Sequence, residues 1–274
     1  MNLEIITILK IFILLIFTLL VRSFIHIYLF KIFNVNLTLT KSIEIISKTS
    51  LLNSIFPLNV GTAYKMKLLK SEIKLSYSSY ISINSAYSVL NIFLNFLIMN
   101  LVLIEYLQTE NIVKQNLFYL SSTTLLGLIF FTYFCFKLNA WSLNNSFVKN
   151  IIQTFFGGFK LFFINKLILI KVSIFSIIFI AINLLIYKIV LEQFGSIFLI
   201  SDLIVLFNLS SIVNLIKLTP GNIGFLEAVL INSEVIHGIL PLAVFGLSIV
   251  LRIVNYFVLL TLLTTITISK ILKK

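Results

Sequence analysis

Charged residues are scarce in this sequence of 274 residues. They make up 11% of the chain, against about 25% in soluble globular domains. Hydrophobic residues make up 59%, and the mean hydropathy is +1.12. The sequence also contains a single cysteine, Cys135, so a disulfide within the chain is excluded. The composition therefore excludes a soluble domain and predicts a membrane protein.

Acidic groups are the scarcest of the charged side chains. The chain has nine of them, and Asp202 is the only aspartate. Membrane transferases generally need clustered acids or histidines for proton transfer, and here only Glu227 and Glu234 fall at helical spacing. His26 and His237 are far apart in sequence and have no cysteine partner. We therefore expect no enzyme activity, no catalytic residues, no metal site and no cofactor.

Long apolar runs account for most of the sequence, and each approaches or exceeds the ~20 residues that span a bilayer. The first run has no small-residue cleavage site after it, so we expect it to be retained as a span rather than removed as a signal peptide. The sequence thus predicts an all-α polytopic membrane protein with about five full transmembrane spans. The runs are 8–21, 89–104, 118–136, 167–187 and 240–268.

The net charge of +12 comes from lysines at the ends of these runs, which excludes a nucleic-acid partner and favours anionic membrane lipids. Cytoplasmic loops carry such an excess. The basic segments 65–74, 137–171 and 270–274 are therefore predicted to be cytoplasmic, with the N-terminus outside. Within the second segment, lysines alternate with aromatic residues, which predicts a helix on the inner surface at about 138–166. We expect a multi-pass protein of the cell membrane (the inner or plasma membrane).

Proline and glycine are rare, with three and nine copies, yet LTPGNIGFLEAVL (218–230) contains several of them. Charge placement puts both ends of 197–237 outside. The simplest structure is a re-entrant hairpin from the outer face, with its tip at Pro220–Gly224. Irregular backbone at membrane depth is tolerated only where protein buries it or where it lines a wet cavity.

The same turn occurs twice. PLNVG (57–61) matches PGNIG (220–224) at Pro, Asn and Gly, and VLNIF (89–93) resembles IVNYF (253–257) at a nearly constant offset. The first turn lies between segments predicted to be cytoplasmic, so its hairpin would enter from the inner face. The sequence predicts an inverted repeat with two re-entrant helical hairpins in one membrane domain, 1–274, with halves of about 1–137 and 167–274.

These motifs resemble the transmembrane region of lysylphosphatidylglycerol synthases and the wider family of flippase-like integral membrane proteins. The more specific part is Pro220, Gly221, Gly224 and Glu227, with Arg252 in the following span. The first motif departs from the family pattern, because Asn59 and Gly61-Thr62 replace an arginine and a Gly-Glu pair, and Lys65 stands where the family tends to have arginine. No segment resembles the soluble aminoacyl-transfer domain. The resemblance implies lipid handling or translocation rather than aminoacyl transfer.

The candidate substrate-binding residues follow from the two turns and from the cations and asparagines near them. Arg252 either pairs with Glu227 or contacts a lipid phosphate, and the asparagines either cap broken helices or contact a head group. The set is Arg252, Glu227, Asn222, Gly221, Gly224, Pro220, Asn59, Gly61, Pro57, Lys65, Asn91 and Asn255.

The expected function is a lipid flippase or transporter that moves an anionic phospholipid, an aminoacylated lipid or a lipid-linked glycan between leaflets. The alternative is a scaffold or regulatory subunit of a cell-envelope lipid or polysaccharide assembly system. The expected partners are membrane lipids and envelope-biosynthesis proteins, and an oligomer is compatible with the sequence. A laterally open, hydrated cavity at the hairpin tips would distinguish the transporter from the scaffold.

Overall fold

The computed structural model describes residues 4–108, 112–137, 146–216, 219, 222–224, 226–228 and 241–272, and every regular element in these ranges is a helix. Five helical segments are long and apolar enough to cross a membrane, which confirms the predicted all-α, multi-pass class. They are Ile5–Lys31, Tyr77–Leu107, Ile112–Cys135, Lys166–Gln193 and Leu242–Ile271. Side and orientation in the membrane stay predictions.

The chain divides into two compact units. Unit 1 comprises Met1–Phe24, Thr38–Lys65 and Ile178–Lys274, and unit 2 comprises Ile25–Leu37 and Met66–Ile177. These units do not coincide with the proposed repeat halves, because unit 1 takes segments from both ends of the chain. The inverted repeat and the single-domain organisation stay predictions.

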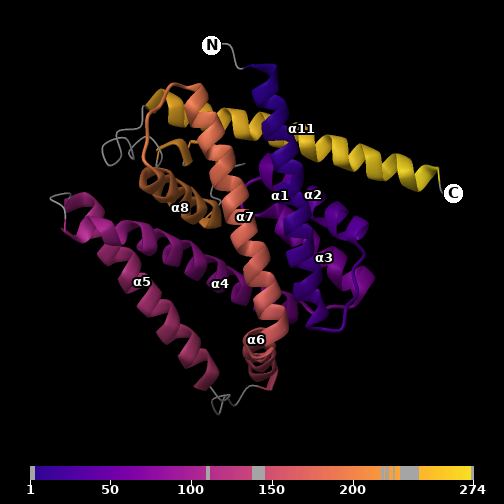
Figure 1. Cartoon of the computed structure of the whole chain (residues 1–274). Helices are drawn as coiled ribbons and strands as arrows, with labels where there is room; N and C mark the ends of the chain where they lie inside the picture. Colours follow the sequence, from indigo (N-terminus) through magenta and orange to yellow (C-terminus); the bar gives the residue numbers. More distant parts are fainter. Residues whose placement is uncertain are drawn as a thin grey trace. The chain divides into compact units, whose positions relative to one another are not determined.

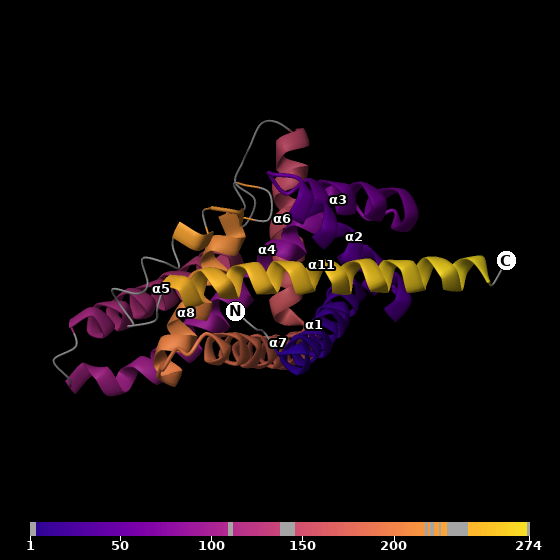
Figure 2. The same ribbon diagram turned by 90° about the horizontal axis from the view of Figure 1, so that it is seen from above.

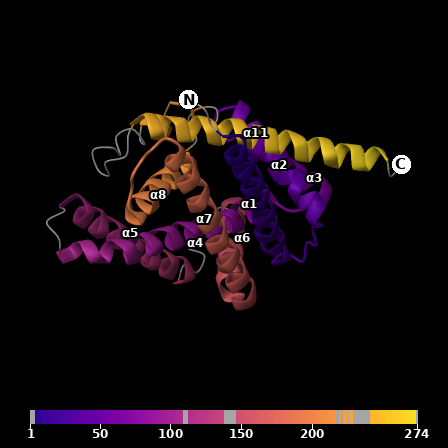
Figure 3. The same cartoon turned by 45° about the horizontal axis from the view of Figure 1, so that its top comes forward.

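Unit 1 is built around the long helix α11. In Figure 2, α11 is the yellow helix, and α2 packs against it. Figure 3 shows α8 beside the N-terminal part of α11. The helices that contribute to this unit, in whole or in part, are α1 (Ile5–Lys31), α2 (Leu39–Ile55), α3 (Val60–Ile73), α7 (Lys166–Gln193), α8 (Ile200–Ile216) and α11 (Pro241–Ile271).

Helix α2 has a local start signal and a local stop signal. The Thr38 side chain accepts a hydrogen bond from the Lys41 backbone N–H, 3.3 Å away, and so caps the N-terminus. At the other end Phe56 is extended, with φ −110° and ψ 144°, because the ring of Pro57 disfavours helical backbone in the residue before it. The sequence therefore determines both ends of α2.

The turn after α2 brings α2 and α3 into close contact. Leu58 and Asn59 both have positive φ angles, 57° and 59°, and together they reverse the chain. A Cβ atom added at Gly61 would lie only 2.1 Å from the Thr49 carbonyl oxygen, so glycine permits the close approach. Helices α2 and α3 thus form a helical hairpin, and its re-entrant insertion stays a prediction.

Unit 2 contains an antiparallel helix pair that diverges from a common end, followed by a third helix (Figure 1). Its elements include α4 (Tyr77–Leu103), the 3₁₀ helix η1 (Ile104–Gln108), α5 (Ile112–Lys137) and α6 (Ser146–Ile164). The Ser76 side chain caps α4 by accepting a hydrogen bond from the Ser79 N–H, 3.1 Å away. Ser121 on α5 donates to the side chain of Asn100 on α4.

Helix α6 packs on α4 as well. Ser82 donates to the carbonyl oxygen of Phe155, and Gly158 lies against the Ser82 side chain. The aromatic side chains of Phe159 and Phe162 are buried. One face of the predicted surface helix is therefore packed against protein, and its position on the inner membrane surface stays a prediction.

Candidate functional site

Glu227 and Arg252 form an ion pair in unit 1. Glu227 Oε1 lies 2.5 Å from Arg252 Nη1, and the side chains are 8% and 21% exposed. A lone charge at the centre of a membrane helix costs about 2.5–3.5 kcal/mol on insertion scales. The pair neutralises both charges. Of the two roles predicted for Arg252, this structure shows the ion pair with Glu227.

The carboxylate of Glu227 also caps a helix start. The Gly224 N–H donates to Glu227 Oε2, 2.8 Å away, and the Ala228 N–H donates to the Gly224 carbonyl, 2.9 Å away. Gly224 therefore occupies the N-cap position and Glu227 the third helical position, which is one half of a capping box. The positive φ of Gly224, 83°, explains why this position favours glycine.

A third residue holds the carboxylate from α11. The hydroxyl of Ser248 donates to Glu227 Oε1 over 2.8 Å. Ser248 lies four residues before Arg252, so both side chains project from the same face of α11. One face of α11 thus supplies a neutral donor and a cation to the same carboxylate.

Two buried polar atoms near this turn have no hydrogen-bond partner among the described residues. They are Arg252 Nη2, a donor, and Asn222 Oδ1, an acceptor. Asn222 is 2% exposed, and its Nδ2 donates to the Val213 carbonyl and to Asn214 Oδ1, each 3.1 Å away. Buried groups of this kind are uncommon and call for a ligand or water. Arg252 Nη2 can donate to an acceptor, and Asn222 Oδ1 can accept from a donor.

The first hairpin contacts α11 close to the ion pair. The Tyr256 hydroxyl donates to the Ser54 carbonyl over 3.1 Å, and Tyr256 lies one helical turn after Arg252. In the first motif, Pro57 is exposed and Asn59 is half-buried. Lys65 is 8% exposed.

The two turns share one backbone feature and differ in another. Asn59 and Asn222 have almost equal positive φ angles, 59° and 57°. However, Asn59 accepts the first backbone hydrogen bonds of α3, whereas Gly224 does so after the second turn. The helix therefore begins two residues later in the second turn, and Gly61 is helical while Gly224 is not.

Four candidate residues remain, and only two of them are among the described residues. Asn255 is half-buried in α11, three residues after Arg252. Asn91 belongs to unit 2. Pro220 and Gly221 lie outside the described residues.

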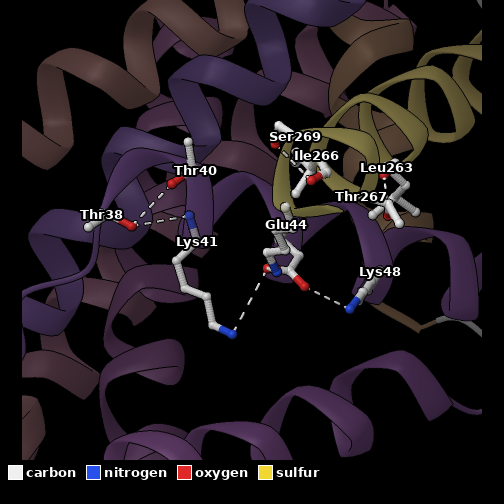
Figure 4. A network of polar contacts seen from close by, with 10 residues as sticks. Thr38, Thr40, Lys41, Glu44, Lys48, Leu263, Ile266, Thr267 and Ser269 are labelled. Carbon is white, nitrogen blue, oxygen red and sulfur yellow. Dashed lines mark hydrogen bonds and ion pairs between the residues drawn. The ribbon is translucent and has the colours of Figure 1, made fainter. Parts of the chain in front are cut away.

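A second polar network surrounds Glu44 on α2 (Figure 4). Its carboxylate lies 2.8 Å from Lys48 Nζ and 2.6 Å from Lys270 Nζ at the end of α11, and 4.0 Å from Lys41 Nζ. Burial alone would raise the pKa of the Glu44 carboxyl, but hydrogen bonds from Lys270 and Lys48 outweigh it. The pKa falls from 4.5 to about 2. One carboxylate thus joins α2 to the C-terminal end of α11.

Sequence reasoning missed three residues that these contacts use: Ser248, Tyr256 and Glu44. The spacing of Ser248 and Tyr256, each four residues from Arg252, is a helical-face signal that could have found the first two. Glu44 has lysines three residues before it and four residues after it, which indicates ion pairs on α2. Its contact with Lys270 leaves no local trace in the sequence.

No three His, Cys, Asp or Glu side chains cluster as a metal site within the described ranges. No protein-family model matches the chain, and no curated protein or solved structure matches it.

Proposed function

We propose that this protein moves an anionic or lipid-linked amphiphile between membrane leaflets and that Arg252 binds the phosphate or carboxylate of the head group. The observation that supports this proposal is the second guanidinium nitrogen of Arg252. Nη1 pairs with Glu227, whereas Nη2 is buried without an acceptor among the described residues. A phosphate oxygen is the acceptor that such a nitrogen binds best.

The ion pair makes this arrangement compatible with transport. Glu227 neutralises the charge of Arg252 while no lipid is bound, so the deep cation carries no large insertion cost. An arriving phosphate can bind Nη2 first and then compete with Glu227 for Nη1 in the bidentate geometry that arginine favours. Gly224 and Ser248 still hold the Glu227 carboxylate, so its charge remains hydrogen-bonded during this exchange.

The two turns supply the route in this proposal. The helix start at each turn carries a positive dipole end that favours an anion. If the hairpins enter from opposite faces, rocking one against the other exposes Arg252 to each side in turn while the lipid tails stay in the bilayer. A lipid can drive this change only if it binds the two states with different affinities.

The test is lipid translocation in liposomes that contain the purified protein and labelled lipids. The lipids are phosphatidylglycerol, its aminoacylated form and a polyprenyl-linked glycan. Arg252→Lys keeps the positive charge opposite Glu227 and removes the second planar donor, so translocation should fall at least about tenfold. Arg22→Lys, at an exposed position on α1, is the matched control and should leave translocation unchanged.

Two results would overturn the proposal. One is that no labelled lipid crosses faster with wild-type protein than with Arg252→Ala. The other is that Arg252→Lys translocates as fast as wild type. A stable complex with an envelope-assembly protein, together with the first result, would support the scaffold alternative.

A further inference from the structure

The spanning helix α4 carries a polar stripe that the ion pair does not explain. At 100° per residue, Asn84, Ser88, Asn91 and Asn95 fall within about 60° of one another on one face of the helix. Exposure falls along the stripe: Asn84 is exposed, Ser88 and Asn91 are half-buried, and Asn95 is buried. The stripe thus runs inward over about 16 Å.

The opposite face of α4 makes the contacts with its neighbours in unit 2. Ser82 bonds the Phe155 carbonyl of α6, and Asn100 accepts from Ser121 of α5. Both residues lie about 160° around the helix from Asn84. The polar stripe is therefore not the face that joins α4 to α5 and α6.

The stripe ends in two unmet acceptors. Asn95 Nδ2 donates to the Asn91 carbonyl, 2.8 Å away, but the side-chain oxygens Asn91 Oδ1 and Asn95 Oδ1 are buried and have no partner among the described residues. Asn95 is 4% exposed. Both lie near the middle of the span Tyr77–Leu107, where hydrocarbon supplies no donor. A packing role alone does not account for them, since leucine would fill the space without leaving an acceptor unpaired.

From these observations we infer that the stripe binds a neutral, hydroxyl-bearing head group, such as a sugar or glycerol moiety, whose hydroxyls donate to the two asparagine oxygens. Its side chains offer amide oxygens and no carboxylate, so hydroxyl donors match them, whereas an ammonium group would lack a counter-charge. This inference rests on the proposed lipid translocation and adds the substrate class to it.

The test is thiol accessibility in native membranes. Single cysteines replace Asn84, Ser88, Asn91 or Asn95 in full-length protein that carries Cys135→Ser, and a charged methanethiosulfonate reagent is added. Such a reagent modifies the thiolate and so needs water at the site. Labelling should be fast at 84 and 88 and slower at 91 and 95. It should be absent in the control Leu101→Cys, because Leu101 is an apolar side chain, 66% exposed on a different face of α4, which we expect to face lipid rather than water.

The ligand class is tested by protection. Maltose and glycerol should each slow labelling at position 91 at least about threefold, and ethylammonium, which carries a cation and no hydroxyl, should not. A second variant, Asn95→Leu with Asn91→Cys, should abolish this protection while its melting temperature stays at or above that of Asn91→Cys alone. That last readout separates a ligand-binding asparagine from a structural one, whose loss would lower the melting temperature.

Absence of labelling at both 91 and 95 would overturn the inference, as would protection by ethylammonium alone or labelling without protection by either hydroxyl compound. These outcomes are independent of the Arg252 experiment. Translocation that depends on Arg252 with an unlabelled stripe would refute only the stripe. A labelled and protected stripe without translocation would refute only the proposed function.

Discussion

In unit 1, the hydroxyl of Tyr256 on α11 donates a hydrogen bond to the carbonyl oxygen of Ser54 near the end of α2, over 3.1 Å. That carbonyl belongs to the last turn of α2, where carbonyl groups lack an intrahelical partner. The bond therefore gives the Ser54 carbonyl a partner. It also attaches the first hairpin to α11, one turn beyond Arg252.

Replacing Tyr256 with phenylalanine removes this bond and leaves the ring in place. We expect a loss of about 0.5–1.5 kcal/mol in the free energy of unfolding, measured by thermal or denaturant unfolding in detergent. Tyr119→Phe, at a side chain 58% exposed on α5, is the matched control and should change stability little. Equal effects of the two substitutions would contradict a role for the Ser54 contact.

The Glu227–Arg252 pair should behave as a unit in a double-mutant cycle. Glu227→Gln or Arg252→Gln alone leaves an unpaired charge in a largely buried position and should cost about 3–5 kcal/mol of unfolding free energy. The double variant should cost less than the sum, with a coupling of about 0.5–3 kcal/mol. Lys188 and Glu192, an exposed pair 3.8 Å apart, should couple by no more than about 0.5 kcal/mol. Additive losses at Glu227 and Arg252 would disprove the pairing.

Gly61→Ala should separate the two arms of the first hairpin. The new methyl group would lie 2.1 Å from the Thr49 carbonyl oxygen and 2.7 Å from Asn53 Oδ1, so the backbone must move, at a cost of about 1–3 kcal/mol. Gly127→Ala in α5 meets no atom within 4 Å and should stabilise by up to about 1 kcal/mol. The melting temperatures of the two variants should shift in opposite directions, and an unchanged Gly61→Ala protein would refute the close packing.

Stability should depend on pH through Glu44. Its pKa is lower in the folded protein, about 2, than its ordinary 4.5. The ionised carboxylate therefore contributes stability that is fully present above pH 4.5 and is lost as pH falls through the window from 4.5 to 2. The melting-temperature difference between wild type and Glu44→Gln in detergent should be constant from pH 5 to 7 and should shrink below 4.5.

The control for this pH dependence is Glu192→Gln, which removes an exposed pair with Lys188 and should change the melting temperature little. A difference between wild type and Glu44→Gln that stays the same down to pH 2 would contradict the Glu44 network as described.

Membrane topology is testable with single cysteines in a Cys135→Ser background. The lysine distribution predicts that Lys70 is cytoplasmic and that Ile197, which is 96% exposed, lies on the outer side. An impermeant thiol reagent added to intact cells should label Ile197→Cys, and Lys70→Cys should be labelled only after permeabilisation. The reverse pattern would refute the predicted orientation of both hairpins.

Much of the fold follows from sequence alone, because its causes are local. Each spanning helix follows from the length and apolarity of one run, and the end of α2 follows from Pro57 and the residue before it. The special backbone at Asn222 and Gly224 follows from the Pro-Gly-Asn-x-Gly pattern, since glycine and asparagine tolerate positive φ.

The candidate site was only partly predictable, because several of its contacts join residues that are far apart in the sequence. The sequence predicts the pairing of Glu227 with Arg252 as one of two alternatives, because a lone charge in an apolar stretch needs a partner. By contrast, Asn91 and Asn255, which look alike in sequence, fall in different units. Contacts such as Lys270 with Glu44 and Tyr256 with Ser54 join residues more than two hundred positions apart. Only the packing of α2 against α11 creates these two contacts. Which polar atoms stay unpaired is likewise decided by tertiary packing, because burial and partners depend on every neighbouring helix at once.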